Sequence, residues 1–385
     1  MSKRILVFTD SHIECGVGIN MAALLEELLH RGYSVHCAQR HEDTAYQRRL
    51  ATAGVEYHWF PRSLDEDIAA FINDHETPYR IFSEARPDLI YFTNGTPAGC
   101  YGAIVVALNL EIPFIISEGL ISEQFLGGNE AERAALQRHY LAARAVITIS
   151  RQNLDYLRAR LGLPADLRVV VPNSPADSYF EPVDKTVRAA RRRELGLSED
   201  GILCFTAAGL RPIKGYAHQI QAIRYLEKHR QFRGIKFAWA GDGPMREFLE
   251  QQIAKFGLGE RVHMLGHSWD VAEWFDAAEI FILPSLGEGM LAVVLEAMAK
   301  GLPVIATPAG GTPEALGDCG HLLSETDDDN VRARALAKTI VNWAGDKKAR
   351  RSAGARGRAR ARTKFIRKKM LNAYLDVIAE TFAAG

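Results

Sequence analysis

The sequence is poor in the features that mark secreted, membrane-spanning and strongly charged proteins. Its 385 residues contain only five cysteines, which are scattered and form no Cys-x-x-Cys pair, so a disulfide framework and a thiolate metal site are disfavoured. Basic and acidic residues number 47 each, and this balance provides no overall attraction for nucleic acid or membrane. No apolar stretch reaches membrane-spanning length, and the N-terminal residues predict a short strand rather than a signal peptide. We therefore expect a cytoplasmic protein, either free or at the inner face of the membrane.

What the sequence does contain is an alternation of apolar strands and amphipathic helices. Hydrophobic residues make up 47% and charged residues 24%, as in an ordinary soluble protein, and the length indicates two or three domains. The predicted strands are 4–8, 34–38, 89–92, 114–117, 146–150, 203–207, 236–240, 262–265, 280–283 and 304–307, and helices are predicted at 21–30 and 103–108. Such alternation predicts parallel sheets covered on both faces. A proline-rich stretch at 171–182 predicts the connection between two α/β domains, 1–178 and 179–385.

The segment 285–307 carries the strongest functional signal. It predicts a strand end, a glycine-containing loop, an apolar helix and a second strand. A helix start leaves amides without intrahelical partners and favours an anion. The amides expected there belong to Gly289, Met290 and Leu291. Glu288 in the loop and Glu296 in the helix can accept hydrogen bonds from hydroxyl groups. Together these groups suit a nucleotide sugar, with its diphosphate, ribose and hexose.

This segment resembles the signature of the retaining glycosyltransferases of family 4 (group 1), which have the GT-B fold. That signature is Glu-Gly, a short variable piece, and then Leu-Glu-Ala-Met-Ala-x-Gly-x-Pro-Val. The matching residues are Glu288, Gly289, Leu295, Glu296, Ala297, Met298, Ala299, Gly301, Pro303 and Val304. The resemblance implies two Rossmann-like, doubly wound domains that face each other across a cleft. It places the acceptor in 1–178, the nucleotide sugar in 179–385, and a C-terminal helix at about 365–382 that crosses back to the first domain.

The resemblance also implies an activity. We expect a hexosyltransferase that moves a sugar from a nucleotide-diphosphate sugar, with a UDP-sugar favoured, to a hydroxyl acceptor with retention. The acceptor would be a glycan, a lipid-linked sugar or a small molecule, and the pathway would build a polysaccharide or glycoconjugate. No metal and no other cofactor are expected, because side chains and helix ends supply the positive charge.

Further donor-site residues follow from the strand ends of the second half. Lys214, and Arg211 three residues before it, come just after a predicted strand and could neutralise the departing diphosphate. Gly241 and Gly243 form a Gly-Asp-Gly-Pro turn that resembles the family's turn near the nucleotide, although it is also a good structural turn. His267 follows another strand, where it contacts the nucleotide or plays a structural role.

The first half offers weaker candidates. Gly16 and Gly18, in Cys15-Gly-Val-Gly18, would let backbone amides approach the diphosphate, although the family usually has adjacent glycines. Cys15 is a packed thiol or a nucleophile. Glu118 stands at the strand end where many relatives carry a histidine, and it could orient or deprotonate an acceptor hydroxyl.

Several alternatives remain open. A nucleotide-sugar 2-epimerase or a phosphorylase would share this architecture, and the missing histidine also suits a non-catalytic nucleotide-sugar-binding protein. An oxidoreductase is disfavoured because Met21 stands where the third glycine of a dinucleotide motif would fall. The aspartates at 327–329 suit a helix start better than a metal site. The basic segment 347–369 suits a solvated face or peripheral contact with anionic lipid, and nucleic-acid binding is not expected.

Overall fold

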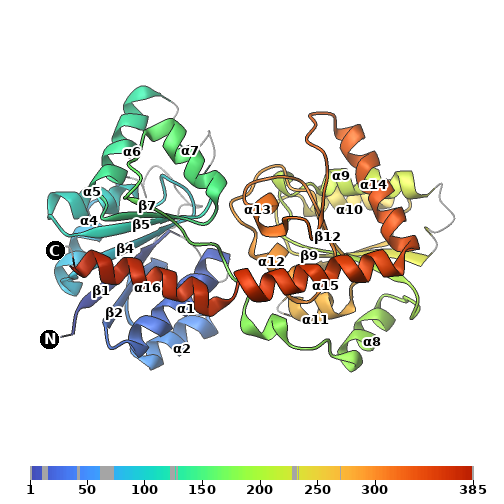
Figure 1. Cartoon of the computed structure of the whole chain (residues 1–385), viewed down its shortest axis with the longest axis horizontal. Coiled ribbons are helices and arrows are strands. Elements are labelled where there is room, and N and C mark those ends of the chain that lie inside the picture. Colours follow the sequence, from blue (N-terminus) through green and yellow to red (C-terminus); the bar gives the residue numbers. More distant parts are fainter. Residues whose placement is uncertain are drawn as a thin grey trace. The chain divides into compact units, whose positions relative to one another are not determined.

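The chain folds into two compact units, each with its own sheet (Figure 1). The computed structural model describes residues 2–10, 16–40, 44–60, 73–121, 126, 129–227, 232, 234–268 and 270–383. The first unit comprises Met1–Asn173 and Lys368–Gly385, and the second comprises Ser174–Arg367. The chain thus passes between units inside the proline-rich stretch, and its last helix belongs to the first unit.

The first unit contains a parallel sheet of seven strands in the order β3-β2-β1-β4-β5-β6-β7. The strands are β1 (Arg4–Thr9), β2 (Ser34–Arg40), β3 (Glu56–Phe60), β4 (Leu89–Asn94), β5 (Phe114–Glu118), β6 (Ala145–Thr148) and β7 (Arg168–Val170). Their order reverses between β1 and β4, the doubly wound arrangement that leaves a crevice at the carboxyl ends of these two strands.

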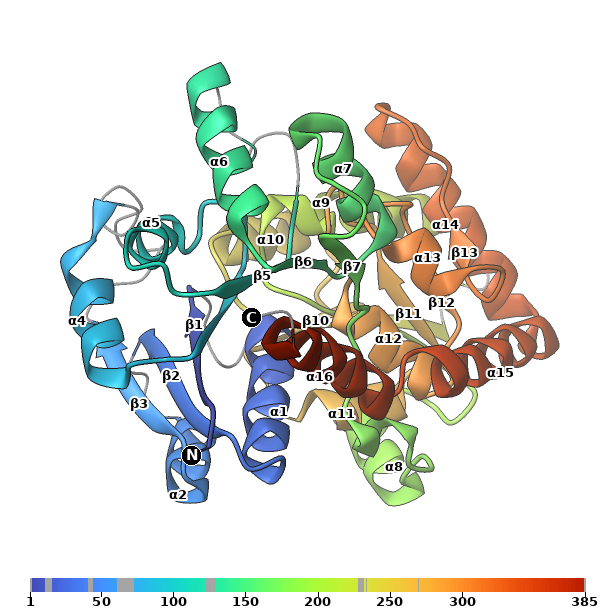
Figure 2. The same cartoon turned by 60° about the vertical axis from the view of Figure 1, so that its left-hand side comes forward.

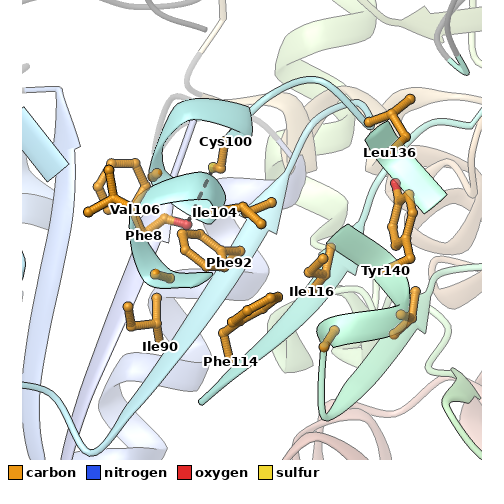
Figure 3. Packing of buried hydrophobic residues seen from close by; sticks show 14 of the residues in the cluster. Phe8, Ile90, Phe92, Cys100, Ile104, Val106, Phe114, Ile116, Leu136 and Tyr140 are labelled. Atoms are coloured by element: carbon orange, nitrogen blue, oxygen red, sulfur yellow. Dashed lines mark hydrogen bonds between the residues drawn. The ribbon is translucent and has the colours of Figure 1, made fainter. Parts of the chain in front are cut away.

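Four helices pack their apolar sides against one face of this sheet. They are α4 (Glu76–Ala85), α5 (Tyr101–Asn109), α6 (Glu130–Ala142) and α7 (Arg151–Leu161). Figure 3 shows Phe8, Phe92 and Phe114 from three neighbouring strands packed in a row, with ring centroids 5.8 and 5.7 Å apart. Cys100 at the start of α5 donates its thiol hydrogen to the carbonyl of Phe8 at 3.8 Å. Because alternate strand residues face opposite sides, the residues between these aromatics form a second core.

That second core packs against α1 (Gly16–His30), α2 (Ala45–Ala53) and α16 (Arg367–Ala383), and Figure 2 shows α16 beside α1. Met370, Tyr374 and Ile378, each one turn apart, are buried against this face. Tyr374 meets Tyr91 of β4 edge to face at 6.1 Å. The burial of this apolar stripe fixes the last helix on the first unit.

The second unit repeats the arrangement with six parallel strands in the order β10-β9-β8-β11-β12-β13. They are β8 (Ile202–Ala207), β9 (Ile235–Ala240), β10 (Val262–Gly266), β11 (Ile280–Leu283), β12 (Val304–Ala306) and β13 (His321–Leu322). Strand order reverses between β8 and β11. Two doubly wound parallel sheets therefore confirm the predicted fold class.

The helices of the second unit cover both faces of its sheet. Against one face pack α9 (Tyr216–Leu226), α10 (Arg246–Lys255) and α14 (Asp329–Gly345). The other helical segments with described bounds in this unit are η2 (Asp177–Phe180), α8 (Lys185–Glu194), η3 (Pro212–Lys214), α11 (Val271–Ala277), α12 (Ala292–Ala299), α13 (Thr312–Leu316) and α15 (Lys347–Lys364). Helix α15 crosses α12 closely, because a Cβ at Gly354 would lie 2.9 Å from the carbonyl carbon of Gly301.

Some strands were not predicted, and some predicted boundaries were wrong. Three sheet-edge strands, β3, β7 and β13, were missed, and β6 ends at Thr148 because Ser150 caps α7 by accepting from the amide of Asn153. Helix α1 begins at Gly16 rather than at residue 21, so the glycines expected in the preceding loop lie in its first turn. Helix α12 begins at Ala292, because the backbone of Leu291 is extended.

Candidate functional site

Three loops meet where the second sheet reverses its strand order. The loop after β8 carries Lys214, the loop after β11 carries Glu288, and the loop after β12 carries Gly310. All three follow the carboxyl ends of parallel strands, where doubly wound sheets hold their ligands. The fold therefore brings residues separated by 74 positions in the sequence into one place.

Lys214 and Glu288 form an ion pair at the centre of this site. The ammonium nitrogen of Lys214 donates to Oε1 of Glu288 at 2.6 Å, and the side chains are 19% and 7% exposed. The amide of Leu286 also donates to the carbonyl of Ile213 at 2.7 Å, so main-chain and side-chain bonds join the same two loops. One unit charge of each sign thus lies at the switch point, partly shielded from water.

Glycines allow these loops to approach one another. Gly310 has φ +58°, and a Cβ there would lie 2.5 Å from the carbonyl carbon of Glu288. Gly215 has φ +74°, and its Cβ would lie 2.8 Å from the carbonyl carbon of Pro284. Both positions combine a left-handed backbone with a close main-chain contact, which only glycine accommodates. They hold the Glu288 loop from two sides.

Gly241 and Gly243 have a packing role. A Cβ at Gly241 would lie 2.8 Å from the carbonyl carbon of Ala208, and one at Gly243 would lie 2.8 Å from the carbonyl oxygen of Leu210. The amide of Leu210 donates to the carbonyl of Asp242 at 2.9 Å. The Gly-Asp-Gly turn therefore supports the loop that leads to Lys214, and direct contact with a donor stays a prediction.

Glu296 lies on α12 and accepts a hydrogen bond from the phenol of Tyr179. Burial raises the pKa of Glu296 to about 7, and the bond from Tyr179 opposes that rise. Tyr179 belongs to η2 and packs edge to face on Phe275 at 5.7 Å. Tyr179 was not predicted from the sequence, although it lies in the proline-rich stretch that was singled out as a connection.

The other donor-site candidates lie on the loops around this pair. Gly289 and Met290 precede α12, and the carbonyl of Gly289 accepts from the amide of Gly311. The exposed Arg211 precedes η3, and its side chain forms no hydrogen bond or ion pair with any residue that the structure describes. His267 is exposed just after β10. Donor contact by all four stays a prediction.

A second polar cluster lies at the carboxyl ends of β4 and β5 in the first unit. Oε1 of Glu118 accepts from the amide nitrogen of Asn94 at 2.9 Å and from the Tyr140 hydroxyl at 2.7 Å. Glu118 is 1% exposed, and burial raises its pKa to about 8. Its Oε2 has no hydrogen-bond partner among the described residues. Contact of Glu118 with an acceptor hydroxyl stays a prediction.

Asp10 lies at the switch point of the first sheet and was missed. Both its carboxylate oxygens accept from the amide of Gly95, at 2.8 and 3.0 Å. A Cβ at Gly99 would lie 2.7 Å from Cγ of Asp10, so the loop after β4 closes around the carboxylate. The sequence feature that could have indicated Asp10 is its place as a charged residue directly after the first strand. Cys15, the proposed packed thiol or nucleophile, lies outside the described residues.

The acidic and basic runs have local structural partners. Asp328 caps α14 by accepting from the amides of Asn330 at 2.8 Å and Val331 at 3.2 Å. Within the described ranges, no group of three or more His, Cys, Asp or Glu side chains is arranged to hold a metal ion. In α15, Arg360 donates to the carbonyls of Ala315 and Glu314, both at 2.8 Å. None of the helices traced in the described part of the chain combines the length and apolarity needed to cross a bilayer.

Comparisons with known families match both halves of the chain. Residues 16–174 match the family described as "Glycosyl transferase 4-like domain", and residues 200–344 match "Glycosyl transferases group 1". The second match includes Lys214, Glu288 and Glu296.

Curated glycosyltransferases are also similar to this chain in sequence. The putative teichuronic acid biosynthesis glycosyltransferase TuaC of Bacillus subtilis is 29% identical over 258 residues, covering 67% of this chain and 61% of that protein. The D-inositol 3-phosphate glycosyltransferase of Xylanimonas cellulosilytica is 30% identical over 245 residues, covering 62% and 57%. The chain therefore spans less than two thirds of the length of these relatives.

Solved structures share the fold over the full length. The HepE protein of Anabaena, solved in complex with UDP, superposes with a TM-score of 0.80 at 20% identity over 99% of this chain and 100% of its own. The sucrose-phosphate synthase of Thermosynechococcus elongatus gives a TM-score of 0.78 at 21% identity over 100% of both chains. The fold is that of GT-B glycosyltransferases.

Proposed function

Since the chain carries a glycosyl transferase 4-like domain and a group 1 glycosyltransferase domain in the GT-B fold, we propose that it is a retaining hexosyltransferase. Its donor is a nucleotide-diphosphate sugar, its acceptor is a hydroxyl group, and its product belongs to a polysaccharide or glycoconjugate. A UDP-sugar is the favoured donor, and the UDP-glucose complex of the HepE protein supports this choice.

The observation that carries this proposal is the 2.6 Å pair of Lys214 and Glu288 at the switch point of the second sheet. A diphosphate that enters this point competes with the carboxylate for the Lys214 ammonium. Glu288, once released from Lys214, can accept hydrogen bonds from hydroxyls of the donor sugar. The pair therefore holds two binding groups in position until one ligand, carrying both phosphate and polyol, separates them.

Arg211 and Glu296 complete the donor site in this proposal. The exposed guanidinium of Arg211 joins Lys214 in balancing the charge that develops on the leaving nucleoside diphosphate. Glu296, oriented by Tyr179, accepts hydrogen bonds from the ribose hydroxyls. The ionised carboxylate is the stronger acceptor, and the hydrogen bond from Tyr179 favours that form.

The transfer step exchanges one bond for another at the anomeric carbon. The bond to the β-phosphate oxygen breaks, and a bond to the acceptor oxygen forms on the same face of an oxocarbenium-like centre. The acceptor proton passes to a phosphate oxygen of the departing diphosphate. Glu118 is 1% exposed and its Oε1 already accepts from Asn94 and Tyr140, so we assign the proton acceptor to the phosphate.

The test is donor-dependent and acceptor-dependent release of nucleoside diphosphate. Purified protein is incubated with UDP-glucose, UDP-galactose or UDP-N-acetylglucosamine, with and without a panel of glycan and polyol acceptors, and free UDP is measured. We expect release only with an acceptor, and we expect Lys214→Ala and Glu288→Gln to lower kcat by at least tenfold. Lys364→Ala, which removes an exposed lysine from the end of α15, is the matched control and should retain activity.

Other results would identify the rival functions. Release of UDP from a UDP-sugar without an acceptor, together with epimerised sugar, would indicate a 2-epimerase. Release of a sugar phosphate from a glycan and inorganic phosphate would indicate a phosphorylase. Donor binding in calorimetry with no turnover of any kind would indicate a nucleotide-sugar-binding protein.

A further inference from the structure

A large cavity lies at the amino-terminal edge of the second sheet, opposite the edge that carries Lys214 and Glu288. Its volume is about 1360 Å³, and its walls include the first residue of β8 and the residues just before β11 and β12. Helix α8 and the start of α15 complete the lining. Donors of doubly wound folds occupy the carboxyl edge, so this cavity is separate from the proposed donor site.

The buried acidic side chains of the cavity lining are paired with basic side chains of the same lining. Arg192 donates to both carboxylate oxygens of Glu279, at 2.9 and 2.8 Å, and Arg188 donates to the same carboxylate. Lys300 pairs with Asp276 at 2.8 Å, and both side chains are less than a tenth exposed. These acids are therefore already balanced by cations from the same wall.

Other basic side chains of the cavity lining are exposed and have no ion-pair partner among the described residues. Lys185, Arg193, Lys347 and Arg351 line the cavity, are exposed and form no ion pair with any described residue. They come from two different helices, α8 and α15, which both line the cavity. A mobile anion in the cavity would be attracted from both sides.

Arg350 provides the second observation. It lines the cavity and is only 8% exposed. Its Nη1 donates to the carbonyls of Trp343 and Ala344 at the end of α14, whereas Nε and Nη2 have no hydrogen-bond partner among the described residues. Burial lowers the pKa of Arg350, and the nearby Glu279 carboxylate opposes this only in part. These two donors are not among the fully buried, unpartnered atoms of the described residues, so they reach solvent, and an anion in the cavity can accept from them.

We propose that this cavity is a second anion site, which binds a soluble phosphate-bearing small molecule between Arg350, Arg193 and Arg351. The guanidinium fork matches two oxygens of a phosphate group. Because Arg350 is recessed in the cavity, a small molecule can reach it, whereas the flat surface of a bilayer cannot. The site is independent of the proposed donor chemistry, since it uses none of the residues that follow the carboxyl ends of the strands.

The experiment measures binding of inorganic pyrophosphate by isothermal titration calorimetry in the Lys214→Ala background, so that the proposed donor site contributes little. We expect one pyrophosphate per chain. Adding Arg193→Gln and Arg351→Gln should raise Kd at least tenfold. The matched control adds Arg356→Gln and Lys364→Gln, which remove two exposed cations of α15 outside the cavity lining, and should change Kd less than twofold.

Each other outcome overturns the proposal. Absence of pyrophosphate binding in the Lys214→Ala background would leave no second site. An equal loss in the cavity and control variants would indicate unspecific attraction to a basic surface. Vesicles of phosphatidylglycerol and phosphatidylcholine form a further arm. Vesicle binding that depends on Arg193 and Arg351, without pyrophosphate binding, would assign these cations to a lipid surface instead.

Discussion

Replacing Gly310 with alanine should destabilise the second unit more than a comparable glycine substitution elsewhere. Gly310 combines φ +58° with main-chain contact, since its Cβ would lie 2.5 Å from the Glu288 carbonyl carbon and closer to two carbonyl oxygens. Gly257 has φ +65°, and a Cβ there would have no atom within 4 Å. The two substitutions therefore share the backbone strain and differ only in the clash.

The expected loss of stability follows from the backbone strain and the clash. A left-handed backbone costs a residue with a Cβ about 1–2 kcal/mol, and this applies to both variants. Forcing an extra methyl group into packed structure costs about 1–3 kcal/mol more, and this applies to Gly310→Ala alone. A loss of 1 kcal/mol lowers Tm by about 2–4 °C in a unit of 150–250 residues. Gly310→Ala should therefore melt at least about 2 °C below Gly257→Ala.

Thermal unfolding followed by tryptophan fluorescence measures this difference, and the same variants are assayed for UDP release. Because the clash displaces the loop that carries Glu288, Gly310→Ala should also lose activity, whereas Gly257→Ala should retain it. Equal melting temperatures, or a fully active Gly310→Ala protein, would refute the reasoning that this glycine holds the Glu288 loop.

Three further predictions concern buried charges. Glu118→Gln should flatten the pH dependence of stability. In the wild type, the raised pKa of Glu118, about 8 against 4.5, contributes stability that is fully present below pH 4.5 and is lost as the pH rises through 8. Urea unfolding midpoints from pH 5 to 9 measure this difference. Tyr179→Phe should raise the pKa of Glu296, so donor binding measured by calorimetry should require higher pH; an unchanged pH profile would exclude this coupling. Arg192→Gln should cost about 3–5 kcal/mol in urea unfolding because it leaves a buried carboxylate underbalanced, whereas its exposed neighbour Arg193→Gln should cost little.

Periodicity and turn residues were sufficient to predict the doubly wound sheets. The missed strands share one property, namely a position at a sheet edge. Strand β3 is partly exposed and carries Glu56 and His58, and β13 has only two residues. Such strands are defined by pairing with a neighbour rather than by their own apolar pattern, and a single sequence does not contain that information.

The site was predictable to the extent that it follows a local motif. Glu288 and Lys214 were found because each stands beside glycine after a strand, but their direct ion pair depends on β8 and β11 being neighbours. Tyr179 and Asp10 had no motif of their own. Each acts on a residue far away in sequence, and only the folded chain brings the phenol to Glu296 and the Asp10 carboxylate to the amide of Gly95.

The basic helix α15 shows why a charge pattern does not reveal its partners. Arg358 and Arg362 both donate to the carbonyl of Phe180, and Arg360 donates to the end of α13. Carbonyls without intrahelical partners occur at every helix end, and a sequence does not show which arginine will lie beside them. These arginines are therefore committed to the fold. The exposed cations at the start of α15, which have no such carbonyl or acid among the described residues, are the ones whose charge is available to a ligand, and Arg351 is the residue on which that distinction can be tested.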